Sequence, residues 1–64
     1  MNKDEVLKFM VNSFKNTNVK IASDSGYPEV LAIQEIEKQT EIITKCMSEL
    51  IDNLLERYPN TQIV

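Results

Sequence analysis

The 64-residue sequence contains no histidine, no tryptophan, one cysteine, one glycine and two prolines. Without histidine it lacks the commonest general base and the usual partner of a serine or cysteine nucleophile. A single thiol cannot close a disulfide within the chain, and it cannot assemble a zinc site from the usual ligands. These absences argue against an enzyme, and we expect no catalytic residue, no cofactor and no metal site.

Long apolar runs are also missing. No stretch approaches the roughly 20 apolar residues of a membrane-spanning helix, and no basic-then-apolar leader opens the chain. We therefore expect no membrane partner. The single free Cys46 favours a reducing compartment and hence a cytoplasmic location. We expect its thiol to be partly buried and inert, as free cysteines commonly are.

Basic residues number seven against ten acidic ones, a net charge of −3, which disfavours binding to nucleic-acid phosphates. The charges are unevenly placed. Residues 1–20 hold four basic and two acidic side chains, whereas residues 21–64 hold three basic and eight acidic ones. This difference could steer the N-terminal segment of one protomer toward the acidic helix of another, or it could be an ordinary solvated surface.

A first helix is indicated near the N-terminus. Asn2 followed three residues later by Glu5 predicts an N-cap with its capping-box partner. Apolar residues then recur at helical spacing as far as Phe14, and Lys15 is expected on the opposite side. We predict an amphipathic helix over about residues 3–15.

Polar residues then predict a linker over residues 16–27. It includes the turn-forming run Ser23-Asp24-Ser25-Gly26, which holds the only glycine. Because a helix is predicted to follow, the turn could bind an anion through backbone N–H groups at the helix N-terminus. The residues of this possible ligand site are Lys20, Ser23, Ser25 and Tyr27.

A second, long helix is predicted over about residues 28–58. Pro28 suits the first helical position, and the residue before Pro59 is biased away from helical geometry. Residues 59–64 are predicted to be a frayed tail. A bend near Gln39-Thr40 is possible, but no proline or glycine is there to cause it. We therefore predict one continuous rod, roughly 46 Å long.

Apolar residues of the long helix alternate at spacings of three and four, which predicts a coiled-coil-like seam over four heptads. Thr40 interrupts the centre of this seam, where it either fixes the register or is tolerated because its hydroxyl bonds the preceding turn. A second apolar set, which includes Ile51 and Leu55, widens the face enough for two neighbours. Together with the first helix, the predicted core and oligomer interface comprises Val6, Met10, Phe14, Ile33, Ile36, Thr40, Ile43, Met47, Leu50, Ile51, Leu54 and Leu55.

The predicted rod is longer than the diameter of a compact 64-residue globule, about 30 Å, and the first helix covers less than half of it. The uncovered apolar length predicts self-association. The expected fold is a single all-α domain, a helical hairpin of one short and one long helix. We expect it to assemble as a coiled-coil-like or helix-bundle homo-oligomer, either a dimer or a tetramer.

By elimination, the expected function is a non-enzymatic protein–protein interaction module. It would act as an intracellular adaptor, regulator or inhibitor, with itself and another protein as partners. The low glycine content beside many Lys, Asn and Ile residues is compatible with a phage or mobile-element gene. Two alternatives stay open: a protein that binds or sequesters a small molecule or nucleotide between protomers, and an acidic nucleic-acid mimic whose Glu35–Glu56 face blocks a DNA-binding partner.

Overall fold

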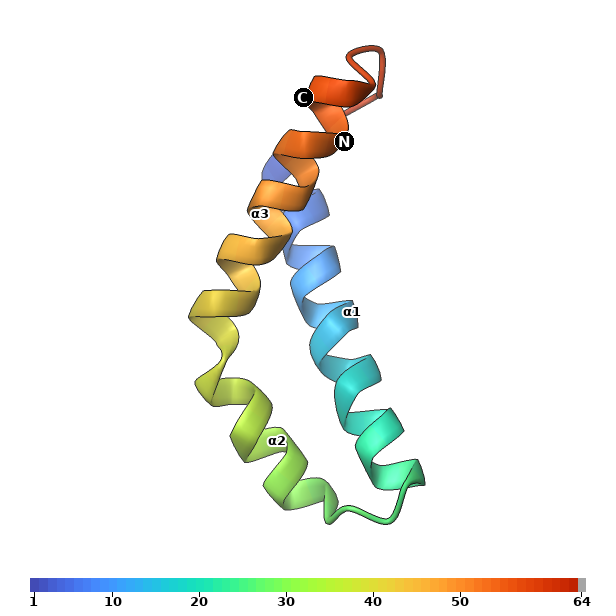
Figure 1. The fold of residues 1–64 in the computed structure, drawn as a ribbon, viewed down its shortest axis with the longest axis vertical. Helices are drawn as coiled ribbons and strands as arrows, with labels where there is room; N and C mark the ends of the chain where they lie inside the picture. Colours follow the sequence, from blue (N-terminus) through green and yellow to red (C-terminus); the bar gives the residue numbers. More distant parts are fainter. Residues whose placement is uncertain (64) are drawn as a thin grey trace.

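The computed structural model describes residues 1–63, and within them the chain is all-α. Three helices follow one another: α1 over Lys3–Asp24, α2 over Glu29–Lys38 and α3 over Thr40–Arg57. Helix α1 forms one arm, and α2 with α3 forms a second arm that runs back along it, so both ends of the chain lie at the same end of the molecule (Figure 1).

Helix α1 begins as predicted. The Glu5 N–H donates to Asn2 Oδ1 over 2.9 Å, and the Asn2 side-chain amide donates to Glu5 Oε1 over 3.2 Å. The first of these bonds satisfies a backbone N–H that has no partner within the helix. The predicted N-cap at Asn2 is therefore confirmed.

The predicted end of this helix near residue 15 is wrong, because α1 continues to Asp24. Val19 packs against the core, and such burial overrides the weak local preference of the polar residues around it. Gly26 follows the end of the helix, and its φ of +91° is the only positive φ in residues 1–63. The Tyr27 N–H bonds the Ala22 carbonyl over 2.9 Å and the Gly26 N–H bonds the Ser23 carbonyl over 3.0 Å, the pattern of a Schellman cap.

The predicted continuous helix over 28–58 is also wrong. The second arm breaks at Gln39, with α2 of 10 residues before it and α3 of 18 after it. The expected lengths are thereby reversed, since α1 with 22 residues is the longest helix. At the break the Gln39 N–H bonds the Ile36 carbonyl over 3.0 Å, and the helical ladder resumes with the Ile43 N–H on the Gln39 carbonyl at 2.9 Å.

The core is small and lies between the arms. Val11, Ile36 and Ile43 form a central cluster, against which Leu7, Val19 and Met47 pack. Beyond it, Ala32 and Ile51 are the most deeply buried residues, 3% and 1% exposed. Along the second arm the buried residues are Ala32, Ile36, Ile43 and Ile51, at spacings of four, seven and eight, which keep them on the side that faces α1.

The molecule is elongated. Its principal extents are 42 × 20 × 18 Å and its radius of gyration is 13.9 Å, whereas a compact chain of this length would have about 11 Å. None of the helices in the described residues is both long and apolar enough to cross a membrane. After α3, residues 58–61 form a turn in which the Thr61 N–H and hydroxyl both bond the Tyr58 carbonyl, over 3.0 and 2.7 Å. The predicted frayed tail is thus a turn as far as it is described, and Val64 lies outside the described residues.

Candidate functional site

The predicted interface set divides into three groups in the structure. Only Ile36, Ile43 and Ile51 are buried. Val6, Met10, Thr40, Met47 and Leu55 are partly buried. Phe14, Ile33, Leu50 and Leu54 are exposed by 40% or more. The structure therefore places part of the predicted set inside the single chain and leaves the rest on its surface.

Apolar side chains are unusually exposed. Among the described residues, twelve large hydrophobic side chains are exposed and only five apolar residues are buried. The accessible surface is 5059 Å², whereas a compact monomer of 7.4 kDa would expose about 4,200 Å². The chain thus exposes about 850 Å² more than its mass requires.

Part of this exposed apolar surface lies on one flank of α1. Helical residues are rotated by about 100° each, so Phe14 and Ile21 lie roughly 60–80° to one side of the core residue Val11. No charged residue interrupts this flank between Lys3 and Asp24. Its members are Val6, Met10 and Ser13, which are partly buried, and Phe14, Thr17 and Ile21, which are exposed.

Helix α3 has a matching flank. Leu50 lies roughly 60° to the same rotational side of the core residue Met47, and it is 54% exposed. This flank holds no charged residue from Ile42 to Leu54, and the first charged residue after them on it is Arg57. Its members are Ile42, Cys46, Leu50, Asn53 and Leu54.

The two flanks lie on the same side of the molecule. Consider two antiparallel helices that face each other across a core. A residue rotated from the core side by the same angle, in the same direction along each chain, lies on the same side of the pair. This holds because one helix is both reversed in direction and turned to face the other. Helices α1 and α3 run in opposite directions (Figure 1). We call this surface, formed by the eleven residues of the two flanks, the uncharged band.

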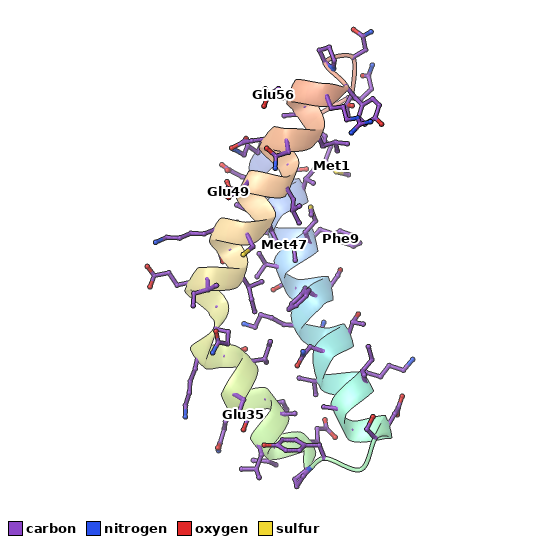
Figure 2. The ribbon with its side chains drawn as sticks, in the orientation of Figure 1. Met1, Phe9, Glu35, Met47, Glu49 and Glu56 are labelled. Carbon is purple, nitrogen blue, oxygen red and sulfur yellow. The ribbon has the colours of Figure 1, made fainter. Side chains whose placement is uncertain are left out.

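Other exposed groups point away from the opposite arm. Figure 2 shows Phe9 on the outer side of α1, and Glu49 and Glu56 on the outer side of α3. Phe9 is 70% exposed and lies about 160° from Val11 around the helix. It is therefore an exposed apolar residue outside the uncharged band.

The ion pairs of residues 1–63 connect charges within one chain. Lys3 pairs with Asp52 and Lys15 with Glu37, each at 2.6 Å, so two basic residues of α1 contact acidic residues of the second arm. The Glu41–Lys45 pair within α3 is 3.6 Å long. The uneven charge distribution in the sequence thus serves contacts between the arms, and the structure does not need a second protomer to explain it.

The position of the Lys15 side chain differs from the prediction. It was expected on the solvent side of α1, but its side chain is only 15% exposed and points across to the second arm. Its Nζ donates to Thr40 Oγ1 over 3.1 Å, and the Thr40 hydroxyl donates to the Glu37 carbonyl over 2.9 Å. Of the two interpretations of Thr40, the structure shows the bond to the preceding turn.

The possible ligand residues are not brought together. Lys20 and Ser23 line a groove of about 390 Å³ between α1 and α2, but Asp24 and Glu29 line it too and would repel an anion. Ser25 instead donates its hydroxyl to the Ile21 carbonyl over 2.9 Å, and Tyr27 donates to Glu35 Oε1 over 2.6 Å. Within the single chain only Lys20 and Ser23 of the predicted four share a groove, and the four-residue site between protomers stays a prediction.

The pKa of Tyr27 is raised above its ordinary value. Its hydrogen bond to the Glu35 carboxylate raises the pKa of the phenol, because the carboxylate holds the phenolic proton; partial desolvation and the negative charge of Glu35 act in the same direction. The residue is exposed, so this contact fastens the turn to α2 and does not create a buried reactive group.

Cys46 also differs from its prediction, because its thiol is exposed rather than partly buried. It lies in the uncharged band. Among residues 1–63, no group of three or more cysteine, aspartate or glutamate side chains is placed to hold a metal ion.

Comparisons with family models, with curated proteins and with solved structures find no significant match to this chain. The function is therefore inferred from the residues and geometry described above.

Proposed function

We propose that this chain is a non-enzymatic protein–protein interaction module that works as a homo-oligomer. The observation that supports this proposal is the excess of exposed apolar surface over what a compact monomer of this mass would show. Exposed apolar patches of several hundred square ångströms mark interaction sites in proteins. Covering that surface with protein removes it from water, at a gain of roughly 25 cal/mol per Å².

In this proposal the oligomer acts as a cytoplasmic adaptor, regulator or inhibitor of another protein, and the gene belongs to a phage or mobile element. Apolar residues outside the uncharged band, such as Phe9 and Val30, are exposed by 70% and 65%. They are available to that second partner after self-association. The free thiol of Cys46 suits a reducing compartment.

The geometry supports the two alternatives less well. A ligand site between protomers would have to use the groove of Lys20 and Ser23, whose other charged residues are acidic. A nucleic-acid mimic needs free carboxylates, yet Glu37 and Glu41 already pair with lysines of the same chain. The acidic face is thereby partly neutralised within the monomer.

Sedimentation equilibrium and light scattering over a range of micromolar concentrations test the proposal. We expect a molar mass of two or four times 7.4 kDa, with circular dichroism showing the same helix content at each concentration. A mass of one chain at every concentration, with helix content retained, would contradict the proposed function.

A further inference from the structure

The second arm changes direction at a single residue (Figure 1). Helix α2 ends at Lys38 and α3 begins at Thr40, with Gln39 alone between them. Gln39 has φ −96° and ψ 2°, so it departs from an ideal helical residue by only about 30° in φ and about 45° in ψ. A small rotation at this one residue would therefore join α2 and α3 into a continuous helix.

The break leaves backbone hydrogen bonds of a continuous helix unmade. The Ile36 carbonyl accepts the Gln39 N–H over 3.0 Å, and the Glu37 carbonyl accepts the Thr40 hydroxyl over 2.9 Å. In a continuous helix these two carbonyls would accept the N–H groups of Thr40 and Glu41 instead. No side chain caps the start of α3, so straightening the arm gives partners to N–H groups of its first turn.

Helices α2 and α3 are attached to α1 in different ways. Residues 25–28 join α2 directly to the end of α1. Helix α3 is connected only through the break, and it contacts α1 through Ile43 beside Val11 and through the ion pair of Lys3 with Asp52. Because α2 is tethered at the turn and α3 is not, α3 is the segment that leaves α1 when the arm straightens.

The surface of α1 that α3 would leave is complementary to α3 of any other copy of this chain. A second copy can therefore remake the same contacts without a new interface, which makes the exchange of an identical element a low-cost route to a dimer. Short hinge segments favour such an exchange over closure within one chain. The hinge here is one residue long and contains neither proline nor glycine.

We infer that two copies of this chain exchange α3. In the dimer Gln39 is helical, the second arm of each chain is one continuous helix over residues 29–57, roughly 43 Å long, and its α3 packs on α1 of the other chain. This inference rests on the proposed function, and it adds the number of copies, the interface and the conformational change that forms it. The contacts of Ile43 with Val11 and of Lys3 with Asp52 then join different chains.

Two valine substitutions test the hinge by sedimentation equilibrium. Thr40→Val removes the hydroxyl that bonds the Glu37 carbonyl and Lys15 in the bent arm. Because two hinges straighten in each dimer, we expect the dimer dissociation constant to fall about 5-fold per hinge. Thr44→Val is the matched control, since its hydroxyl bonds the Thr40 carbonyl over 2.7 Å within α3, whether the arm is bent or straight. It should change the dissociation constant less than about 3-fold.

Gln39→Gly should act in the opposite direction. Glycine is tolerated at a helix end but is less favourable than glutamine inside a helix. We therefore expect this substitution to raise the dissociation constant about 3-fold per hinge. A change that only loosened the fold would not move the constant in opposite directions in Gln39→Gly and Thr40→Val.

A mixing experiment tests the exchange itself. Lys3→Asp and Asp52→Lys each place like charges at the ion pair between α1 and α3, but a mixed dimer that exchanges α3 joins opposite charges at both of its pairs. The two variants are mixed in urea, refolded together at low salt and examined by native mass spectrometry. We expect mixed dimers to exceed random pairing about 3-fold.

The matched control is a mixture of Glu41→Lys with Lys45→Glu. These two chains have the same net charges as the test pair, but the pair of residues 41 and 45 lies within α3 of one chain, so exchange cannot restore it. We expect their mixed dimers to form at a lower frequency than those of the test pair.

The outcomes separate this inference from the proposed function. A wild-type chain that is monomeric at every concentration overturns both. A wild-type oligomer in which Thr40→Val binds no tighter than Thr44→Val, or in which the test mixture shows no more mixed dimers than the control mixture, overturns the exchange of α3 and leaves the proposed function standing. If Thr40→Val loses its helical circular dichroism, the mixing experiment decides alone.

Discussion

Lys15 Nζ donates a hydrogen bond to Thr40 Oγ1 over 3.1 Å, and this contact joins the middle of α1 to the point where the second arm breaks. The same ammonium lies 2.6 Å from Glu37 Oε1, so it contacts both sides of the break. The Thr40 hydroxyl in turn bonds the Glu37 carbonyl at the end of α2. Because α3 has no side-chain N-cap, these contacts stabilise a break that the local sequence does not favour.

Removing the charge of Lys15 should therefore destabilise the fold. Lys15→Met keeps the packing of the aliphatic stem and removes both polar contacts. We expect the free energy of unfolding to fall by about 1 kcal/mol, discounted for the exposure of Glu37. Urea unfolding at one fixed chain concentration measures it.

Lys45→Met is the matched control, because Lys45 is 75% exposed and its pair with Glu41 is 3.6 Å long. We expect that change to cost about 0.5 kcal/mol or less. If Lys15→Met is no more destabilising than Lys45→Met, the contact at the break does not stabilise the fold.

Ile51 provides a test of the core. It is 1% exposed and is the only large side chain that is fully buried in the described residues. Ile51→Ala removes apolar contact and leaves a cavity, and we expect a loss of about 3 kcal/mol. Thermal unfolding followed by circular dichroism measures the effect.

Val30→Ala serves as the comparison for Ile51→Ala, since Val30 is 65% exposed and lies outside the uncharged band. It should change stability by about 0.5 kcal/mol or less. Equal losses from the two substitutions would show that Ile51 is not buried as the structure has it.

The contact between Tyr27 and Glu35 predicts that the stability of the folded chain depends on pH in the alkaline range. Its pKa in the folded chain is raised above the ordinary value of 10.0 by the bond to Glu35. The stability from this contact is therefore fully present below pH 10.0 and is lost as the pH rises through the raised pKa of the folded state. Titration of phenolate absorbance in a Tyr58→Phe background, which leaves one tyrosine, follows this group.

Glu35→Gln is the control for that titration. It removes the carboxylate charge and weakens the hydrogen bond, so the pKa of Tyr27 should fall back toward 10.0. A pKa of Tyr27 that is the same in the Glu35→Gln variant as in the chain that keeps Glu35 would contradict the contact. The substitution is also expected to leave helix content unchanged, because position 35 is exposed.

The all-α class and the start of α1 could be predicted because both depend on residues close together in sequence. The cap at Asn2 involves a residue three positions away. The end of α1 was missed, although Gly26 offered the signal: a glycine at this position is a common helix terminator. The polar residues 16–18 predict an earlier end of the helix, but the packing of Val19 against the core favours its continuation.

The break at Gln39 could not be predicted in the same way. It depends on a contact between Lys15 and Thr40, which are 25 residues apart, and no proline or glycine marks it. The exposed surface was predicted only in part for a related reason. The spacing of apolar residues assigned Leu50, Ile51 and Leu54 together to the core and oligomer interface, and in the single chain Ile51 is buried whereas the two leucines are exposed.

The distribution of buried residues along the arms has a consequence for how the molecule opens. Ala32 lies near the turn, Ile51 lies near the chain ends, and the central cluster of Val11, Ile36 and Ile43 lies between them. Because this burial is spread along a rod 42 Å long, we expect each end of the molecule to open locally while the central cluster stays packed. Amide exchange should then be graded from the ends inward. A partner lying along the rod would join the segments into a single unit that opens all at once.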